Sequence, residues 1–426
     1  SLPEQHRFVI PDGCHWQDIR ERSENLGSAI VEAMHKIEIA NPDTLYGVLS
    51  IFSAQKWTDK KVLSDERIRN LIEHLSKRRL GNKDYPADLM GDAYEVLLKK
   101  FADDSKAQAG EFYTPRAVVR LLVRILDPQP GETVYDPACG SGGMLIEAIR
   151  YMHSDDLCCG SIFGQEKNVV NAAIAKMNLF LHGASDFNIM QGDTLRNPKI
   201  LQNDTLARFD CVIANPPFSL EKWGAKEWST DKYGRNLWGI PSDSCGDYAW
   251  IQHMVCSMSF GKGRMAVVMP QGVLFRGNQD GEIRKKLVQS DLVEAVVTLG
   301  DKLFYGTQLS PCFLILRRTK PADRSARILM IDGSRILTPK RAQNELSEAD
   351  VDRLYELYAN YADVEDFAKV VTLADIEAKD FSLSPNRYVE YHREEVKPYA
   401  EVKAEFLAAY ETLKRCEARF VELINQ

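Results

Sequence analysis

Apolar residues along the chain follow two different periods, which predict helices towards both ends and a sheet between them. Helical spacing predicts three N-terminal helices, at 19–37, 65–78 and 86–101. Short apolar runs that end in Gly, Pro or acidic residues predict strands at 133–136, 160–165, 187–193, 209–214, 265–269, 292–297 and 312–316. A last helix, at 394–424, has apolar residues three and four positions apart, as an amphipathic helix does.

This order of elements predicts an α/β fold with helical regions before and after the sheet. We expect an N-terminal helical domain at 1–107, a catalytic α/β domain at 108–335 and a C-terminal helical and connecting region at 336–426. The chain is long enough for two or three domains with a substantial core.

A glycine-rich turn follows the first predicted strand. The sequence TVYDPACGSGG, at 133–143, predicts a strand that ends at Asp136, a tight turn, and a helix from Met144. Glycines let a ligand approach the backbone, and the start of the helix offers unpaired N–H groups. The spacing matches neither the dinucleotide fingerprint nor a P-loop. The arrangement is typical of an S-adenosylmethionine (AdoMet) site, in which Asp136 would meet the ammonium group of the methionine part.

Two further acidic residues end the next strands. Glu166 follows the second strand at the position where an acidic residue meets ribose hydroxyls in such sheets. Asp193 ends the third strand and could bind the adenine amino group. Each signal alone is common in α/β proteins, but their order on successive strands favours a methyltransferase.

The fourth strand runs into Asn215-Pro216-Pro217-Phe218. The exocyclic nitrogen of adenine is a poor nucleophile because its lone pair is shared with the ring. The Asn215 side-chain carbonyl and a backbone carbonyl beside it could accept hydrogen bonds from this NH2 group and expose its lone pair. The prolines remove competing donors, and Phe218 offers a flat face to an extruded base. The alternative is an ordinary turn at the end of a strand, since Asn-Pro and Pro-Pro are common turn dipeptides.

With these motifs the sequence resembles the methylation (M) subunit of type I restriction–modification systems, a γ-class N6-adenine DNA methyltransferase. The resemblance runs from about Leu89 to about Val389, and its most specific piece is GEFYTPR at 110–116. In that family this segment caps the methionine end of the cofactor. The resemblance implies a Rossmann-like AdoMet-dependent methyltransferase sheet with an N-terminal helical domain and a C-terminal helical tail.

The resemblance also implies the site residues, with S-adenosyl-L-methionine as cofactor and no metal. The implied cofactor contacts are Glu111, Phe112, Tyr113, Thr114, Pro115, Arg116, Asp136, Ser141, Gly142, Gly143, Glu166 and Asp193. The implied catalytic residues are Asn215, Pro216, Pro217 and Phe218.

The net charge of the chain bears on how such an enzyme would bind DNA. The chain has 54 basic and 61 acidic residues, a net charge of −7, whereas a protein that grips DNA alone usually needs a basic face. A local basic excess at 317–341 predicts either a solvated hairpin and loop or a strip that faces phosphates. A partner subunit would explain the acidic total. The resemblance implies a specificity (S) subunit, a second M subunit and a restriction (R) subunit.

Three regions leave alternatives open. The N-terminal helices could cap the catalytic domain or help to hold DNA. The helix at 394–424 could pack within the chain or dock on the helices of a partner. The segment 218–248, with three tryptophans, could be a mobile loop near the extruded base or surface disorder.

Other activities are less consistent with the sequence. A glutamine-N5 protein methyltransferase also uses an Asn-Pro-Pro turn, but lacks the cap formed by Phe112 to Pro115. An N4-cytosine DNA methyltransferase usually has Ser in place of Asn215. Intact Asp136, Glu166 and Asn215 argue against a catalytically silent assembly subunit.

The remaining composition predicts a cytoplasmic protein. Nine cysteines without a C-x-x-C pair indicate reduced thiols rather than disulfides or structural zinc. No apolar run approaches the roughly 18 residues of a membrane span, and no signal-peptide pattern is present.

Overall fold

The computed structural model describes residues 8–51, 56–78, 87–104, 114–152, 160–304, 309–340, 343–392 and 399–424. The chain forms two compact units, at 1–389 and 390–426. The finer division at 107 and 335 stays a prediction.

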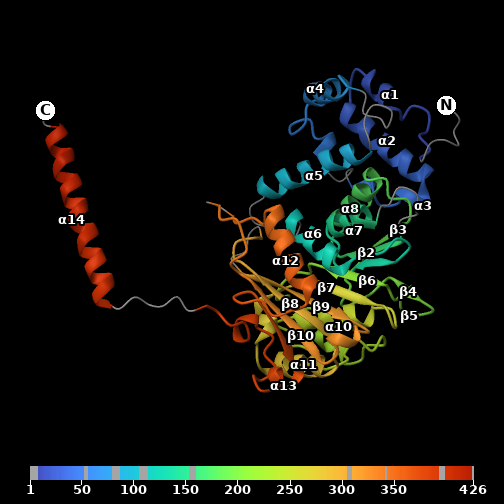
Figure 1. Ribbon diagram of the computed structural model, residues 1–426. Coiled ribbons are helices and arrows are strands. Elements are labelled where there is room, and N and C mark those ends of the chain that lie inside the picture. The colour runs from blue at the N-terminus through green and yellow to red at the C-terminus, as the bar shows by residue number, and fades with distance from the viewer. Residues whose placement is uncertain are drawn as a thin grey trace. The chain divides into compact units, whose positions relative to one another are not determined.

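Within the described residues, a nine-stranded sheet forms the centre of the first unit (Figure 1). Its order is β11-β10-β8-β9-β7-β6-β1-β2-β3. The strands are β1 (Val134–Asp136), β2 (Ile162–Glu166), β3 (Phe187–Gln191), β6 (Cys211–Ala214), β7 (Arg264–Pro270), β8 (Val293–Leu299), β9 (Pro311–Arg317), β10 (Arg327–Gly333) and β11 (Ala368–Thr372). Strands β9 and β11 run antiparallel to their neighbours, and the other neighbouring pairs are parallel. A small hairpin, β4 (Leu201–Gln202) with β5 (Thr205–Leu206), lies outside this sheet.

Helices cover both faces of the sheet. The described helices are α1 (Trp16–Arg20), α2 (Leu26–Ala40), α3 (Pro42–Leu45), α4 (Asp65–Leu75), α5 (Ala87–Asp104), α6 (Arg116–Leu126), α7 (Gly143–Met152), α8 (Val169–Leu181), α9 (Ala225–Trp228), α10 (Asp247–Cys256), α11 (Asn278–Gln289), α12 (Glu348–Asn360), α13 (Leu373–Glu377) and α14 (Tyr399–Ile424). Helices α6, α7, α8 and α12 pack on one face, and α10 and α11 pack on the other (Figure 1). Strand residues alternate between these two cores, so that Ile213 belongs to the first and Val212 to the second.

The predicted α/β fold is confirmed, and every strand predicted from the sequence forms. Strands β10 and β11 were missed, because the short apolar run of β10 lies among charged residues and β11 is a half-buried edge strand. The single helix expected at 19–37 is wrong, since it is divided into α1 and α2. The division falls at Asn25, whose φ is 55°, where the Asp65 carboxylate accepts hydrogen bonds from the N–H groups of Asn25 and Leu26.

The order of strands creates a crevice beside β1. The chain passes from β1 outward through β2 and β3, and then returns to β6 on the other side of β1. Because β1, β2 and β6 are parallel, their carboxyl ends lie at one edge of the sheet. Such a switch point is where open α/β sheets bind ligands, and it brings Asp136 and Asn215 to neighbouring strand ends.

The segment 218–248 is packed at several points, so the alternative of surface disorder is wrong, whereas mobility near an extruded base stays a prediction. Trp223 and Trp228 are buried and meet edge to face, with ring centroids 5.0 Å apart. Arg235 is buried as well and forms an ion pair of 2.7 Å with Asp231. Trp223 and Trp228 thus belong to the second core, together with α10 and α11.

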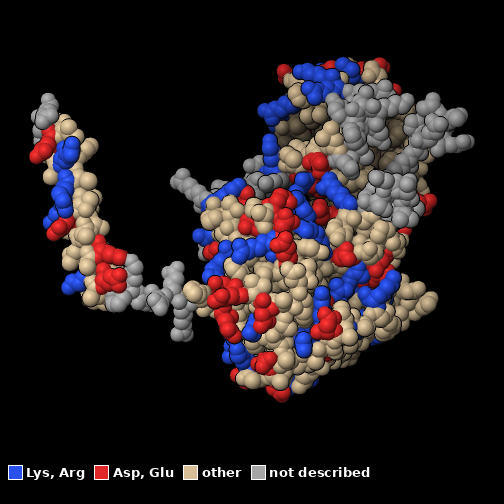
Figure 2. Space-filling view, viewed as in Figure 1, with Lys and Arg blue, Asp and Glu red and all other residues tan. Residues whose placement is uncertain are grey.

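The basic stretch 317–341 is partly buried, and several of its cations are paired. Arg317 and Arg324 both pair with Glu294, and Lys320 pairs with Asp291. Much of the stretch forms β10, whose middle residues are buried. It is therefore neither a simple solvated loop nor a free strip of cations. On the face of the molecule in Figure 2, basic and acidic side chains are interspersed.

The second unit contains α14, which begins at Tyr399. The predicted start at 394 lies outside the described residues. Every side chain of α14 is exposed, including Phe406, Tyr410 and Phe420. None of the described helices is both long enough and apolar enough to cross a membrane.

Candidate active site at the carboxyl edge of the sheet

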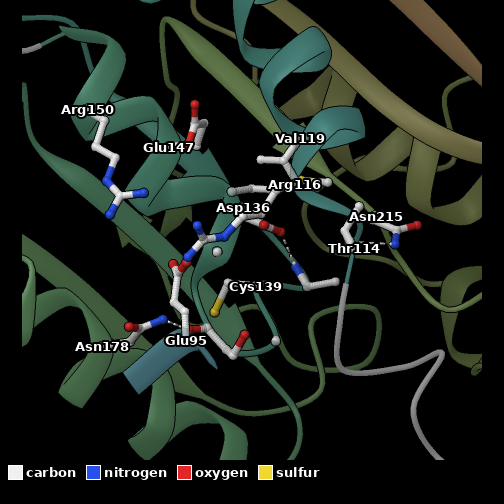
Figure 3. Close-up of a pocket in the computed structure, with 15 residues that line it drawn as sticks. Glu95, Thr114, Arg116, Val119, Asp136, Cys139, Glu147, Arg150, Asn178 and Asn215 are labelled. Atoms are coloured by element: carbon white, nitrogen blue, oxygen red, sulfur yellow. Dashed lines mark hydrogen bonds and ion pairs between the residues drawn. The ribbon is translucent and has the colours of Figure 1, made fainter. Parts of the chain in front are cut away.

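A cavity opens to solvent at the carboxyl ends of β1 and β6. It is lined by Glu95, Thr114, Arg116, Val119, Asp136, Ala138, Cys139, Gly140, Ser141, Gly143, Met144, Glu147, Arg150, Asn178 and Asn215 (Figure 3). Six of the predicted site residues therefore meet here, namely Thr114, Arg116, Asp136, Ser141, Gly143 and Asn215.

Asp136 is a buried acid at the base of this cavity. One carboxylate oxygen accepts a hydrogen bond of 2.9 Å from the N–H of Ala138. Burial raises the pKa of the Asp136 carboxyl to about 8, although the Ala138 N–H lowers it and the negative charge of Glu166 raises it further. No ion pair with Asp136 is present among the described residues. A cation in the cavity would therefore be strongly favoured at this carboxylate.

The glycine-rich turn beside Asp136 is held by residues of α8. Gly142 has a φ of 83°, which favours glycine, and a Cβ there would lie 3.4 Å from the Cβ of Ala175. The side chain of Asn178 donates to the carbonyl of Ser141 at 3.1 Å. A Cβ on Gly140 or Gly143 would meet only open space, so these two glycines leave room for a ligand.

Glu166 contributes to this turn directly. Its Oε2 accepts a hydrogen bond of 3.0 Å from the N–H of Gly140, and its Oε1 accepts one of 2.7 Å from Asn168. Glu166 is absent from the cavity lining, as is Asp193, which pairs with Lys167 at 2.9 Å. The ribose contact of Glu166 and the adenine contact of Asp193 stay predictions.

The turn at 215–218, which is predicted to be catalytic, is connected to the segment before α6. The Nδ2 atom of Asn215 donates to Oγ1 of Thr114 at 2.9 Å. Pro216 is buried and Pro217 is exposed. Phe218 is half-buried and lies near Phe304, with ring centroids 6.3 Å apart. Among the hydrogen bonds of the described residues none involves Asn215 Oδ1, so this oxygen is available to accept.

A set of charged residues at the cavity was missed by the sequence analysis. Arg116 pairs with Glu95 and with Asp92, and Asp92 also pairs with Arg150 at 2.7 Å. Burial raises the pKa of the Glu147 carboxyl. The spacing of Asp92 and Glu95, three positions apart on one helix, was a signal that they share a face. Nothing in the sequence indicated that this face meets the cofactor cavity.

Some of the predicted site residues are not among those that line the cavity. Glu111, Phe112 and Tyr113 fall outside the described residues, so the expected cap over the cofactor stays a prediction. Pro115 and Gly142 adjoin lining residues without lining the cavity themselves.

Comparisons with known proteins agree with this geometry. The family described as N-6 DNA Methylase matches residues 86–397. The type I restriction enzyme MjaVII methylase subunit of Methanocaldococcus jannaschii is 36% identical over 333 residues, which cover 76% of this chain and 56% of that protein. The type I restriction enzyme HindI methylase subunit of Haemophilus influenzae is 32% identical over 360 residues, 82% of this chain and 76% of that protein.

A solved structure shows the same fold. The methyltransferase subunit of a type I restriction–modification system from Streptococcus thermophilus superimposes with a TM-score of 0.79 at 26% identity, covering 91% of this chain and 82% of that one. The chain spans 56% and 65% of the lengths of the MjaVII and MjaVIII methylase subunits.

Proposed function

The chain belongs to the N-6 DNA methylase family, and from this premise we propose that it is the methylation subunit of a type I restriction–modification enzyme. Its reaction is the transfer of a methyl group from AdoMet to N6 of adenine in DNA. The observation that carries the proposal is the placement of Asn215, whose amide is held by Thr114 at the cavity that also contains Asp136 and the glycine-rich turn.

The cavity suits AdoMet in three respects. Asp136 is a buried carboxylate with a raised pKa, and it would hold the ammonium group. The open space beside Gly140 and Gly143 admits a ligand close to the backbone. Asn178 Oδ1 is buried and has no hydrogen-bond partner among the described residues, so it offers an acceptor. AdoMet, when bound, supplies an activated methyl group on a sulfonium.

The protein's own contribution is to position the acceptor base. Asn215 Oδ1 and the Pro216 carbonyl accept hydrogen bonds from the adenine NH2 group, which exposes the nitrogen lone pair. Thr114 fixes the amide so that its oxygen faces the base. Phe218 stacks on the ring of an adenine extruded from the duplex. Positioning and hydrogen bonding supply the catalysis, and no general base is needed because the methylated nitrogen becomes acidic.

The proposed cofactor site combines residues that line the cavity with residues that are predicted from the sequence. Thr114, Arg116, Asp136, Ser141 and Gly143 line the cavity. We assign the ribose hydroxyls to Glu166 and the adenine amino group to Asp193, because both follow neighbouring strands at the same edge. The cap of Glu111, Phe112 and Tyr113 completes the proposed site.

Binding of DNA is proposed to depend on partners. The net charge is −7, and the charges seen in Figure 2 are interspersed rather than gathered into one basic face. A specificity (S) subunit would choose the DNA target, and a second M subunit and a restriction (R) subunit would complete the assembly. The exposed apolar residues of α14 suit contact with a partner's helices.

Sequencing of modified bases in cells tests the proposal. Cells that express this chain together with the S subunit encoded beside it should contain N6-methyladenine at one two-part sequence. The same cells with Asn215→Ala should lack the mark. If adenine is unmodified with wild type, or if cytosine carries the mark, the proposal is wrong.

A further inference from the structure

The residue directly after the catalytic turn has an unusual backbone conformation. Ser219 has a φ of 50°, which a residue with a Cβ adopts unfavourably. Its N–H donates a hydrogen bond of 2.7 Å to Oδ1 of Asp247. Strained backbone of this kind persists only where the surroundings hold it, and here it follows Phe218 immediately.

Asp247 is itself held in place. It is the first residue of α10 and is completely buried. Its other carboxylate oxygen accepts from the guanidinium of Arg276 and from the Cys245 thiol at 3.3 Å. Arg276 also binds Asp280 through Nε at 3.0 Å. Because a buried carboxylate needs a charged partner, Arg276 is what makes the position of Asp247 stable.

The segment that follows the catalytic turn and the segment that leads into α10 are joined by further hydrogen bonds. These bonds lie farther from the catalytic turn. Gly246 N–H donates to the Leu220 carbonyl at 2.9 Å, and Lys222 N–H donates to the Asp243 carbonyl at 2.7 Å. Among the described residues, the contact from Asp247 is the one that reaches the neighbour of Phe218. Of these three hydrogen bonds, only the one to Asp247 involves a side chain, so a single substitution can remove it.

We infer that Asp247, supported by Arg276, is a positioning residue for methyl transfer, an inference that rests on the proposed function. The turn is held at its start by the bond between Asn215 and Thr114, and just past its end by the bond between Ser219 and Asp247. Phe218 lies between these two fixed points. Asp247 does not line the cavity, so it acts on the base through the turn rather than on the cofactor.

This role predicts a defect in turnover and base capture without a defect in AdoMet binding. A small displacement of a reacting group caused by a distant substitution can lower the rate by about 100-fold. We expect Asp247→Ala to lower kcat by about that factor. The kcat of Asp247→Asn should lie between those of Asp247→Ala and wild type, because the amide oxygen of asparagine can still accept the hydrogen bond from Ser219. Ser219→Gly should stay close to wild type, since glycine adopts this φ readily and keeps the N–H.

Glu294 provides a matched control. It is another completely buried carboxylate with arginine partners, Arg317 at 2.6 Å and Arg324 at 2.9 Å. It lies near the amino end of β8, at the opposite edge of the sheet from the turn. Glu294→Ala should therefore destabilise the protein as Asp247→Ala does, while the kcat of the folded enzyme stays within twofold of wild type.

The experiment combines two measurements. Amide hydrogen exchange of the full chain should be faster over 215–223 in Asp247→Ala than in Glu294→Ala, with β1 and β2 unchanged. In the enzyme assembled with its S subunit, kcat should fall for Asp247→Ala and the AdoMet affinity should stay within twofold. Equal exchange over 215–223 in the two variants, or a wild-type kcat for Asp247→Ala, would overturn the inference.

The failure of this inference can be told apart from the failure of the proposed function. If the wild-type assembly methylates no adenine, the proposed function fails, whereas the exchange measurement still decides whether Asp247 fixes the turn. Should Asp247→Ala not fold, Asp247→Leu, which has a similar shape but no acceptor, and Arg276→Lys carry the same test. An unchanged exchange rate and an unchanged kcat in both would refute the positioning role.

Discussion

Asn215 donates a hydrogen bond of 2.9 Å from its amide nitrogen to the hydroxyl of Thr114. Thr114 lies just before α6, and Asn215 lies just after β6, so two distant parts of the sequence meet at this bond. The bond leaves the amide oxygen of Asn215 free for the role that we propose for it, as the acceptor for the adenine amino group. It connects the segment before α6, which lines the cavity, with the turn that is proposed to hold the base.

Replacement of Thr114 by Val should lower the rate of methyl transfer. The side chain keeps its shape but loses the hydroxyl, and a single such hydrogen bond contributes about 0.5–1.5 kcal/mol, which corresponds to a rate loss of up to about tenfold. Single-turnover methylation measures this effect. Thr114→Ser keeps the hydroxyl and serves as the control; equal rates for the two variants would show that the bond does not orient Asn215.

Asn215→Ala should abolish most of the activity and leave AdoMet binding nearly intact. Loss of a well-placed hydrogen-bonding group at a reacting centre lowers the rate by about 100- to 1,000-fold. Phe218→Ala should weaken capture of the base, so that 2-aminopurine at the target position loses its extruded-base fluorescence. Turnover like that of wild type in Asn215→Ala would contradict the proposed chemistry.

The affinity for AdoMet should depend on pH through Asp136. In the empty protein the pKa of this carboxyl is about 8, so it is protonated below that pH. A bound ammonium group favours the ionised carboxylate. Binding should therefore release a proton below pH 8, and the affinity should rise with pH up to about 8 and then fall, because the α-ammonium group of AdoMet loses its own proton at about that pH. Calorimetry in buffers of different ionisation enthalpy measures the proton release. Asp136→Asn should bind more weakly and show none of this release; the same release in that variant would assign it to another group.

Glu166→Ala should weaken AdoMet binding by roughly 1.5–3 kcal/mol, the range for hydrogen bonds to charged groups. Two effects act in the same direction, because Glu166 holds the N–H of Gly140 and is the proposed acceptor for the ribose hydroxyls. Calorimetry on the full chain checks the value. Asp186→Ala, which removes a carboxylate that binds Ser161 near the amino end of β2, is the control and should bind normally. An unchanged affinity in Glu166→Ala would show that the ribose site is misplaced.

The sequence was most informative where the determinants of structure are local. Strand ends at Asp136, Glu166 and Asn215 follow from short apolar runs and turn residues, and the fold places all three at one edge of the sheet. Aromatic residues were misjudged, because the burial of Trp223 and Trp228 depends on packing between distant segments.

Contacts between distant segments could not be predicted from the sequence for the same reason. The pairing of Arg116 with Glu95 requires α5 to lie at the cavity, and the bond of Asp247 to Ser219 requires α10 to begin beside the catalytic turn. Neither pair of residues has a spacing in the sequence that predicts its contact. The cap at 111–113 was suggested by family resemblance, and its geometry stays a prediction.

The central claim is that this chain is a partner-dependent adenine methyltransferase. The most direct test is transfer of tritium from labelled AdoMet to duplex DNA, measured for the purified chain alone and with the S subunit encoded beside it. We predict little label for the chain alone, because it is net acidic, and N6-methyladenine at a two-part site when the S subunit is added. Efficient methylation of one defined sequence by the chain alone, or label on a base other than adenine, would contradict the account.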